Sequence, residues 1–248
     1  GFELVQNRPL LIPSTKRAVE SALTAMKEAA PGPMLNSIRT SVHVHFDVTS
    51  YTFLDLLVWC LVYWTIEPYI SYFCSETRRG NLFCLRHTDS QFAPLDLALA
   101  IKGMNPYSAR SFTEDLRYAS LNLASVCKFG SLEFRLKEGT DDPAEVATWI
   151  DILEKVRQFS LGFNNPLQFR DFFLRKCDAK DLPEIILGKE LVSVINKRRG
   201  KQPLPPEKEI REAFVGLTKL FAAHKTFNFE EEVKATLEEQ KAKAAALQ

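Results

Sequence analysis

Two segments of the chain alternate between apolar and polar residues with the period of a β-strand. In residues 40–48, TSVHVHFDV, the alternating positions are Val42, Val44 and Phe46 against His43, His45 and Asp47. In residues 126–137, VCKFGSLEFRLK, they are Leu132, Phe134 and Leu136 against Ser131, Glu133, Arg135 and Lys137. Because side chains two positions apart share one face of a strand, each segment is predicted to be a strand with one apolar and one ionisable face.

Apolar residues three or four positions apart predict helices elsewhere. One is expected from Ser14, as its cap, to about Ala30, with a stripe formed by Val19, Leu23, Met26 and Ala30. Another is expected after the cap Asp142, with Pro143 at its first position and Glu145 three residues beyond the cap. Its predicted buried face consists of Val146, Trp149, Leu153 and Val156.

The most apolar segment is residues 53–66, FLDLLVWCLVYWTI, which is 14 residues long and contains Asp55. A bilayer span needs about 20 apolar residues, so this segment is predicted to be a helix in a protein core. We expect Thr49 or Ser50 to cap it and Pro68 to bend or end it. No association with a membrane is expected.

The character of the chain changes after about residue 164. Several helical stretches follow, interrupted at Pro183, Gly188, Gly200 and residues 201–206. The last, from about Phe229, is rich in Glu, Lys and Ala and is expected to be solvated, or to face a partner or a second copy. The predicted fold class is α+β: residues 1–163 with an antiparallel or mixed sheet and helices on one of its faces, then a helical region over residues 164–248.

Composition excludes some classes of function but does not identify one. The 248 residues are 46% hydrophobic and 25% charged, which is typical of a soluble globular protein. Lys and Arg total 32 against 31 acidic residues, so no net field favours nucleic acid or an anionic membrane as a partner. The five cysteines are odd in number and lack CxxC spacing, and the chain start lacks a signal peptide. We therefore expect reduced thiols in a cytoplasmic protein.

The ionisable faces of the two predicted strands carry the candidate chemistry. His43 and His45 share a face of one strand, and Glu133 shares a face of the other with Arg135. Alone, a His-x-His strand more often faces solvent, and a Glu-x-Arg strand more often makes an ion pair. In one sheet, however, imidazoles and a carboxylate could hold a divalent cation, while arginine could bind a carboxylate or phosphate.

Four strings in order resemble the amidoligase family, ATP- and metal-dependent carboxylate–amine ligases related to glutamine synthetase. SVHVHFDV resembles the family's HVH strand, and GSLEFRLKEGTDDPAEVATWIDIL resembles its closing strand, Gly-Thr turn and tryptophan-containing helix. Between them, Arg78-Arg79-Gly80-Asn81 with Cys84 resembles its arginine–asparagine–cysteine segment. GFELVQNRPLL at the start resembles its glutamate-bearing strand. Together the strings span about residues 1–160.

The resemblance implies a sheet of the glutamine-synthetase type and a role for each matching residue. The implied ligands of Mg²⁺ or Mn²⁺ are His43 and Glu133 for one ion and Glu3 for a second. The residues implied to lie toward ATP are His45, Asn81 and Asn122. Arg135 would hold the substrate carboxylate or the transferring phosphoryl group, and Arg78 or Arg79 would stabilise phosphate charge. The implied substrates are a small-molecule or peptide carboxylate and an amine.

The mechanism that the resemblance implies has two steps. ATP phosphorylates a carboxylate, and an amine then displaces phosphate from the acyl phosphate to form an amide. The sequence has no GxxxxGK[ST] loop, so metal and arginine would hold the phosphates.

Two departures from the family pattern keep other functions open. The family's opening E-x-E strand is missing, so the domain over residues 1–163 is expected to be N-terminally incomplete. Ser131 also stands where glutamine synthetases carry an arginine. One alternative is a catalytically inactive relative with a binding or structural role. Another is a metal-dependent hydrolase that uses His43 and His45, although His87 and His224 are poorly situated as a third ligand.

Overall fold

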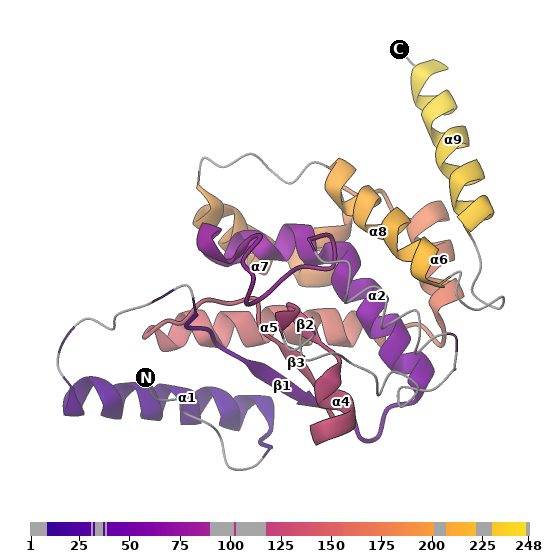
Figure 1. Cartoon of the computed structure of the whole chain (residues 1–248). Helices are drawn as coiled ribbons and strands as arrows, with labels where there is room; N and C mark the ends of the chain where they lie inside the picture. Colours follow the sequence, from indigo (N-terminus) through magenta and orange to yellow (C-terminus); the bar gives the residue numbers. More distant parts are fainter. Residues whose placement is uncertain are drawn as a thin grey trace.

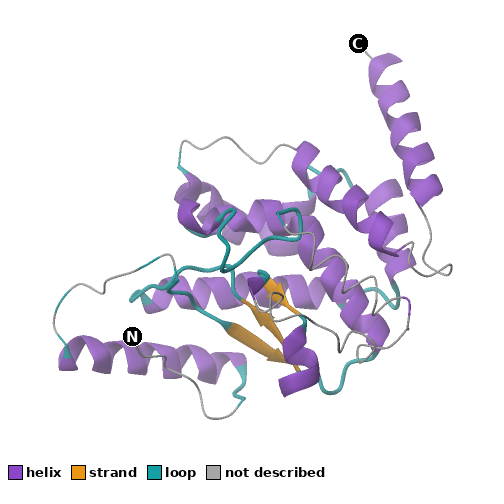
Figure 2. Cartoon of the chain, in the orientation of Figure 1, coloured by secondary structure: helices purple, strands orange, loops and turns teal. Residues whose placement is uncertain are grey.

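A small antiparallel sheet lies at the centre of a mainly helical chain (Figure 2). The computed structural model describes residues 9–30, 32, 37, 39–89, 102, 118–200, 207–221 and 230–246. Within them, the strands are β1 (Val44–Asp47), β2 (Leu121–Asn122) and β3 (Ser131–Phe134), in the spatial order β1-β3-β2. The predicted α+β class with an antiparallel sheet is therefore confirmed.

β1 and β3 pair in a register that places their polar residues on one face of the sheet and their apolar residues on the other. His45 lies opposite Glu133, and Phe46 lies opposite Leu132. Before β1 the pairing continues irregularly, because the N–H of Val42 donates to the carbonyl of Lys137 over 3.0 Å and Ser41 bridges Glu138. Val42 and His43 thus lie opposite three residues, 135–137, which makes a bulge beside β1. The regular strand is shorter than the predicted one over residues 40–48.

The predicted strand over residues 126–137 is wrong in its first part. Ala124–Phe129 is helix α4, and Gly130 follows it with φ +67° before β3 begins. Glycine adopts this left-handed conformation readily, and a Cβ at Gly130 would lie 2.6 Å from Cγ2 of Thr49. Val126 and Phe129 are three positions apart, which places them on one face of a helical turn but on opposite faces of a strand, so the strand alternation does not extend to this part.

Helix α2 (Phe53–Ile70) forms the core, as predicted, but its ends differ from those expected. Thr52 is the cap instead of Thr49 or Ser50: Oγ1 of Thr52 accepts from the N–H of Asp55, whose carboxylate accepts from the N–H of Thr52. The helix also continues two residues beyond Pro68. Pro68 lies in the last turn, where the loss of one backbone hydrogen bond does not end the helix.

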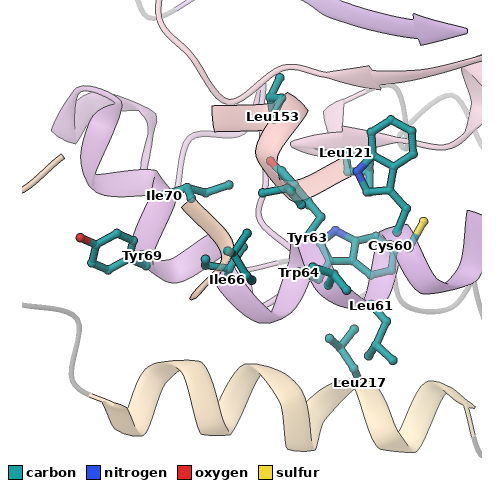
Figure 3. Packing of buried hydrophobic residues seen from close by; sticks show 14 of the residues in the cluster. Cys60, Leu61, Tyr63, Trp64, Ile66, Tyr69, Ile70, Leu121, Leu153 and Leu217 are labelled. Carbon is teal, nitrogen blue, oxygen red and sulfur yellow. The ribbon is translucent and has the colours of Figure 1, made fainter. Parts of the chain in front are cut away.

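Residues 56–70 of α2 are all buried. On one side, Trp59 contacts Phe46 and Phe134 of the sheet, at ring-centroid distances of 5.4 and 5.6 Å. On another side, helix α8 (Glu207–Phe221) packs along α2, with Leu217 beside Leu61 (Figure 3). Phe53–Phe73 is long and apolar enough to cross a membrane, but 83% of its apolar window is buried inside the protein.

The remaining helices surround this core (Figure 1). They are α1 (Ile12–Ala29), the short η1 (Ser71–Phe73) and η2 (Glu76–Arg78), α5 (Pro143–Ser160), α6 (Pro166–Arg175), α7 (Leu182–Arg199) and α9 (Glu230–Ala246). Helix α1 begins before the expected cap Ser14 and lies along α5. Helix α9 extends away from the other helices (Figure 1). The cap Asp142 and the buried face of α5 are confirmed.

The helices beyond residue 164 are confirmed where the structure describes them, and they share one hydrophobic core with the sheet and α2. Phe214 and Leu217 of α8 belong to the same cluster as Phe134 of β3. The five cysteines are all free thiols, as predicted. Burial raises the pKa of Cys60 to about 12 and that of Cys84 to about 11, so these thiols are unreactive at neutral pH.

Candidate active site

The polar face of the sheet brings together the two pairs of residues that the sequence singled out. Nδ1 of His43 lies 3.1 Å from Oε1 of Glu133, and Nε2 of His45 lies 3.7 Å from the same oxygen. Nη1 of Arg135 is also 3.7 Å from it. Two imidazoles and a guanidinium therefore surround one carboxylate oxygen, as the alternation in both strands predicted.

The opposite face of the same strands explains why this arrangement is stable. Phe46 and Phe134 lie between the polar residues in sequence and pack against each other at 5.8 Å and against Trp59. A slip of the register by one residue would expose these rings and bury the ionisable groups. The hydrophobic core thus fixes His45 directly opposite Glu133.

Three neutral side chains bind the outer atoms of this cluster. Nδ2 of Asn122 donates to Oε2 of Glu133 over 2.6 Å. The hydroxyl of Ser41 lies 2.7 Å from Nε2 of His43, and the hydroxyl of Ser131 lies 3.0 Å from Nδ1 of His45. Of these three, the resemblance had assigned a role only to Asn122, as a contact to ATP, and had marked Ser131 as a departure from the family pattern.

Glu133 is ionised at neutral pH even though its side chain is only 8% exposed. Burial favours its neutral form, but hydrogen bonds from His43 and Asn122 and the charge of Arg135 outweigh burial and lower its pKa. Burial also lowers the pKa of Arg135, an effect that the charge of Glu133 opposes. The side chain of His45 is 41% exposed, so the cluster opens to solvent on the imidazole side.

Arg78 binds the backbone next to this cluster. Its side chain is buried, and its guanidinium donates to the carbonyls of Arg135 at 2.7 Å and Leu136 at 3.2 Å. These bonds hold the backbone that follows β3, where the ladder to β1 becomes irregular. Arg78 therefore supports the strand that carries Glu133, and its role toward phosphate remains a prediction.

Arg79 and Asn81 contact their own loop. The guanidinium of Arg79 lies 4.5 Å from the ring centroid of Tyr72 and 3.8 Å from the carboxylate of Glu76. The side chain of Asn81 donates to the carbonyl of Thr77 over 3.0 Å. The structure does not bring either residue into contact with Glu133, and their roles toward ATP also remain predictions.

The family of the chain follows from a comparison with known proteins. A family model described as "Putative amidoligase enzyme" matches residues 2–157, which is more than half of the chain. The chain belongs to the amidoligase family. The match includes His43, His45, Glu133 and Arg135, and the expected resemblance is confirmed. No curated protein and no solved structure matches the chain.

A second ionisable cluster in this amidoligase was not foreseen. Glu67, near the end of α2, accepts hydrogen bonds from the N–H of His87 at 3.1 Å, from Nδ1 of His87 at 2.9 Å and from the hydroxyl of Ser120. Both side chains of the Glu67–His87 pair are almost fully buried. An acidic residue within so apolar a helix was the only sign of it in the sequence. His87 therefore lies in the core, whereas His43 and His45 lie on the polar face of the sheet.

A divalent cation requires ligand atoms at defined separations. Two ligand atoms that each lie about 2.1 Å from a cation are about 3.0–3.5 Å apart at tetrahedral or octahedral angles. Nδ1 of His43 meets this condition with Oε1 of Glu133 at 3.1 Å, whereas Nε2 of His45 at 3.7 Å would have to move slightly closer. The residues that the structure describes contain no ready-made group of three such ligands. Glu3 lies outside the described residues. His43 and Glu133 thus fit two ligands of a cation in chemistry and spacing.

Proposed function

We propose that this amidoligase joins a carboxylate to an amine with ATP and a divalent cation, through an acyl phosphate. The observation that supports this function is the convergence of two imidazoles and a guanidinium on the ionised, largely buried carboxylate of Glu133. Such a site pairs a cation-binding side with an anion-binding side, and a ligase that activates a carboxylate with a nucleotide needs both.

On the cation-binding side, Glu133 and His43 would ligate one Mg²⁺ or Mn²⁺, and Glu3 would serve a second ion. When bound, a divalent cation neutralises phosphate charge during in-line transfer. His45 is the most exposed member of the cluster and would lie toward the phosphates, where its Nε2 could also contact the cation that His43 and Glu133 hold. Asn122 would act through Glu133, whose second oxygen it already binds. Arg79 and Asn81 would have to leave their loop contacts to reach ATP.

On the anion-binding side, Arg135 is the residue best suited to the substrate. Its side chain is 16% exposed, so water screens its charge only in part. Its planar guanidinium can bind the two oxygens of a carboxylate or phosphoryl group side by side. Because Arg78 donates to the carbonyl of Arg135, the backbone that positions this guanidinium is itself held.

The proposed reaction balances in two displacements. A substrate carboxylate oxygen attacks the terminal phosphorus of ATP, the bond to the ADP oxygen breaks, and an acyl phosphate forms. The nitrogen of a neutral amine then attacks the acyl carbon, inorganic phosphate leaves, and the nitrogen loses a proton. In both displacements, Arg135 would stabilise the negative charge on the phosphoryl or acyl oxygens. His43 and Glu133 would keep the reacting groups in position.

The test is release of ADP from Mg·ATP in the presence of amino acids and hydroxylamine, which traps acyl phosphates as hydroxamates. We expect Glu133→Gln to abolish ADP release without loss of the circular dichroism spectrum. Glu154→Gln is the matched control, because Glu154 pairs with Arg157 on α5. Turnover retained in Glu133→Gln would remove the assignment.

Thermal stabilisation separates this function from the two alternatives. A non-hydrolysable ATP analogue that stabilises the protein only with Mg²⁺ supports the ligase. Stabilisation by Zn²⁺ without nucleotide would instead support a hydrolase that uses His43 and His45. A protein that responds to neither would be an inactive relative with a binding role.

A further inference from the structure

The two histidines of the candidate site use different ring nitrogens toward Glu133. His43 turns Nδ1 toward the carboxylate and Nε2 toward the hydroxyl of Ser41. His45 does the reverse, with Nε2 toward the carboxylate and Nδ1 toward the hydroxyl of Ser131. Each imidazole therefore lies between a carboxylate and a serine.

When both imidazoles are neutral, the proton positions in the cation-free site follow from these neighbours. An ionised carboxylate only accepts hydrogen bonds, so Nδ1 of His43, at 3.1 Å from Glu133, must carry the hydrogen. Nε2 of His45, at 3.7 Å, is too distant for a hydrogen bond, but the negative charge of Glu133 favours the hydrogen on the nitrogen that faces it. A neutral imidazole has one N–H, so its outer nitrogen is an acceptor. Each serine hydroxyl must then be the donor. This assigns the Nδ1–H tautomer to His43 and the Nε2–H tautomer to His45.

A bound cation requires the opposite arrangement. A metal ligand must offer a lone pair, so the inner nitrogen has to give up its hydrogen and the outer nitrogen has to carry one. The neighbour of the outer nitrogen must then accept. A hydroxyl can donate in one state and accept in the other, which neither an alanine nor an arginine can do.

We propose that Ser131 and Ser41 are positioning residues that orient His45 and His43, set their tautomers, and exchange donor for acceptor when a divalent cation binds. The cation would meet Nδ1 of His43 and Nε2 of His45. This inference rests on the proposed function for the cation, and it gives a reason for a serine at position 131, where an arginine could only donate.

The fold holds both hydroxyls in place. Ser131 is the first residue of β3, is 7% exposed, and its carbonyl accepts from the hydroxyl of Ser125 over 2.8 Å. It precedes Glu133 by two residues and therefore shares its face of the strand. Ser41 pairs with Glu138 beyond the bulge, two residues before His43. Neither hydroxyl depends on a long, flexible side chain.

The first test reads the tautomers in the metal-free protein at about pH 9, where free imidazoles are neutral. Long-range ¹H–¹⁵N spectra suit a chain with four histidines, and His43→Gln and His45→Gln assign the signals. We expect Nδ1–H for His43 and Nε2–H for His45. Ser131→Ala should give a mixture of tautomers at His45 and leave His43 unchanged. Ser131→Thr should restore the single Nε2–H tautomer of His45. The control Ser75→Ala should change the tautomer of neither histidine. Opposite tautomers, or a His45 spectrum unaffected by Ser131→Ala, would overturn the proposal.

The second test uses Mn²⁺ alone. Loss of a partner behind a metal-binding histidine typically weakens metal affinity by about 10–100-fold, so we expect Ser131→Ala to weaken Mn²⁺ binding at least tenfold and Ser131→Thr to recover most of it. Unchanged affinity in Ser131→Ala, or no Mn²⁺ binding by the unsubstituted protein, would also overturn the proposal. Neither test uses ATP or a carboxylate, so a lack of ligase activity would count against the proposed function alone.

Discussion

Asn122 donates its side-chain amide to Oε2 of Glu133 over 2.6 Å, from the strand on the other side of β3 from the histidines. The same side chain accepts the N–H of Ala124 at 2.9 Å, at the start of α4. The amide therefore links the turn after β2 to the carboxylate at the centre of the candidate site, and both oxygens of Glu133 are engaged.

Asn122→Asp separates these two functions of the amide. The substitution keeps an acceptor for Ala124 but replaces the donor to Glu133 by a second carboxylate, which raises the pKa of the pair. We expect a loss of about 1–3 kcal/mol in the free energy of unfolding at pH 7, and a smaller loss at pH 5, where one shared proton restores the hydrogen bond. Urea unfolding at both pH values measures this.

The control for this prediction is Asn165→Asp. Asn165 caps α6 by accepting from the N–H of Gln168, and aspartate caps helices equally well. Its unfolding free energy should change little at either pH. If Asn122→Asp changed the unfolding free energy as little as this control, the hydrogen bond from Asn122 to Glu133 would contribute nothing to stability.

A buried charge network predicts how stability depends on pH. Lys137 is fully buried, with its ammonium bonded to Glu138 and, at 2.9 Å, to Glu145. Arg198 of α7 binds the same two carboxylates. Burial opposes ionisation of both carboxyl groups, but hydrogen bonds outweigh it, from Lys137 and the N–H of Ser75 to Glu138 and from Arg198 and Lys137 to Glu145. Both pKa values therefore lie below the ordinary 4.5.

Because these pKa values are lowered by folding, the unfolded chain binds protons first as the pH falls. The stability that Glu138 and Glu145 contribute is complete above about pH 4.5 and is lost as the pH falls through their folded values. We expect Glu145→Gln to be less stable than the unsubstituted protein at pH 7, and to lose less stability between about pH 6 and pH 3.5. The exposed Glu76→Gln serves as control. Equal pH dependence in all three proteins would contradict the network.

The Glu67–His87 pair predicts a contrast between histidines. His87→Ala would leave Glu67 buried without one of its hydrogen-bond partners, and leaving a buried polar group without its partner costs about 1–3 kcal/mol. His45→Ala removes a side chain that is 41% exposed and should cost less than about 1 kcal/mol. Chemical unfolding of both variants measures the difference. Similar small losses would mean that the pair is energetically neutral.

The site could be predicted where the pattern was local. Residues 44–47 and 131–134 have their faces set by alternation alone, so the meeting of His45 with Glu133 followed once the two strands paired. The prediction for residues 126–129 failed because the strand was extended beyond the alternating residues: Val126 and Phe129 are three positions apart, a helical spacing, and Gly130 in the left-handed conformation separates helix α4 from β3.

Contacts between distant parts of the sequence could not be predicted. Arg78 binds carbonyls 57 and 58 residues further along the chain, so its burial behind β3 leaves no trace in its local sequence. Ser41 and Ser131 are ordinary polar residues in the alternating segments, and only the structure brings their hydroxyls to the histidines. A buried polar group reveals its partner only after the chain has folded.

The packing of α8 on α2 predicts that the helical C-terminal region is needed for residues 1–163 to fold. Leu217 and Leu61 are both fully buried where the two helices meet (Figure 3). Leu217→Ala should lower the free energy of unfolding by about 2–5 kcal/mol, as core truncations of leucine do. The exposed Leu161→Ala should change it by less than about 0.5 kcal/mol.

Ending the chain at residue 163 would remove α8 entirely and should destabilise the rest more than Leu217→Ala does. It would expose the side of α2 that α8 covers, including Leu61 and its buried neighbours. Exposed apolar surface of this size favours aggregation over folding. We expect residues 1–163 alone to lack a cooperative unfolding transition and to bind a hydrophobic dye. A soluble fragment that unfolded cooperatively would show that the sheet and α2 form an independent domain, with α8 as an appendage.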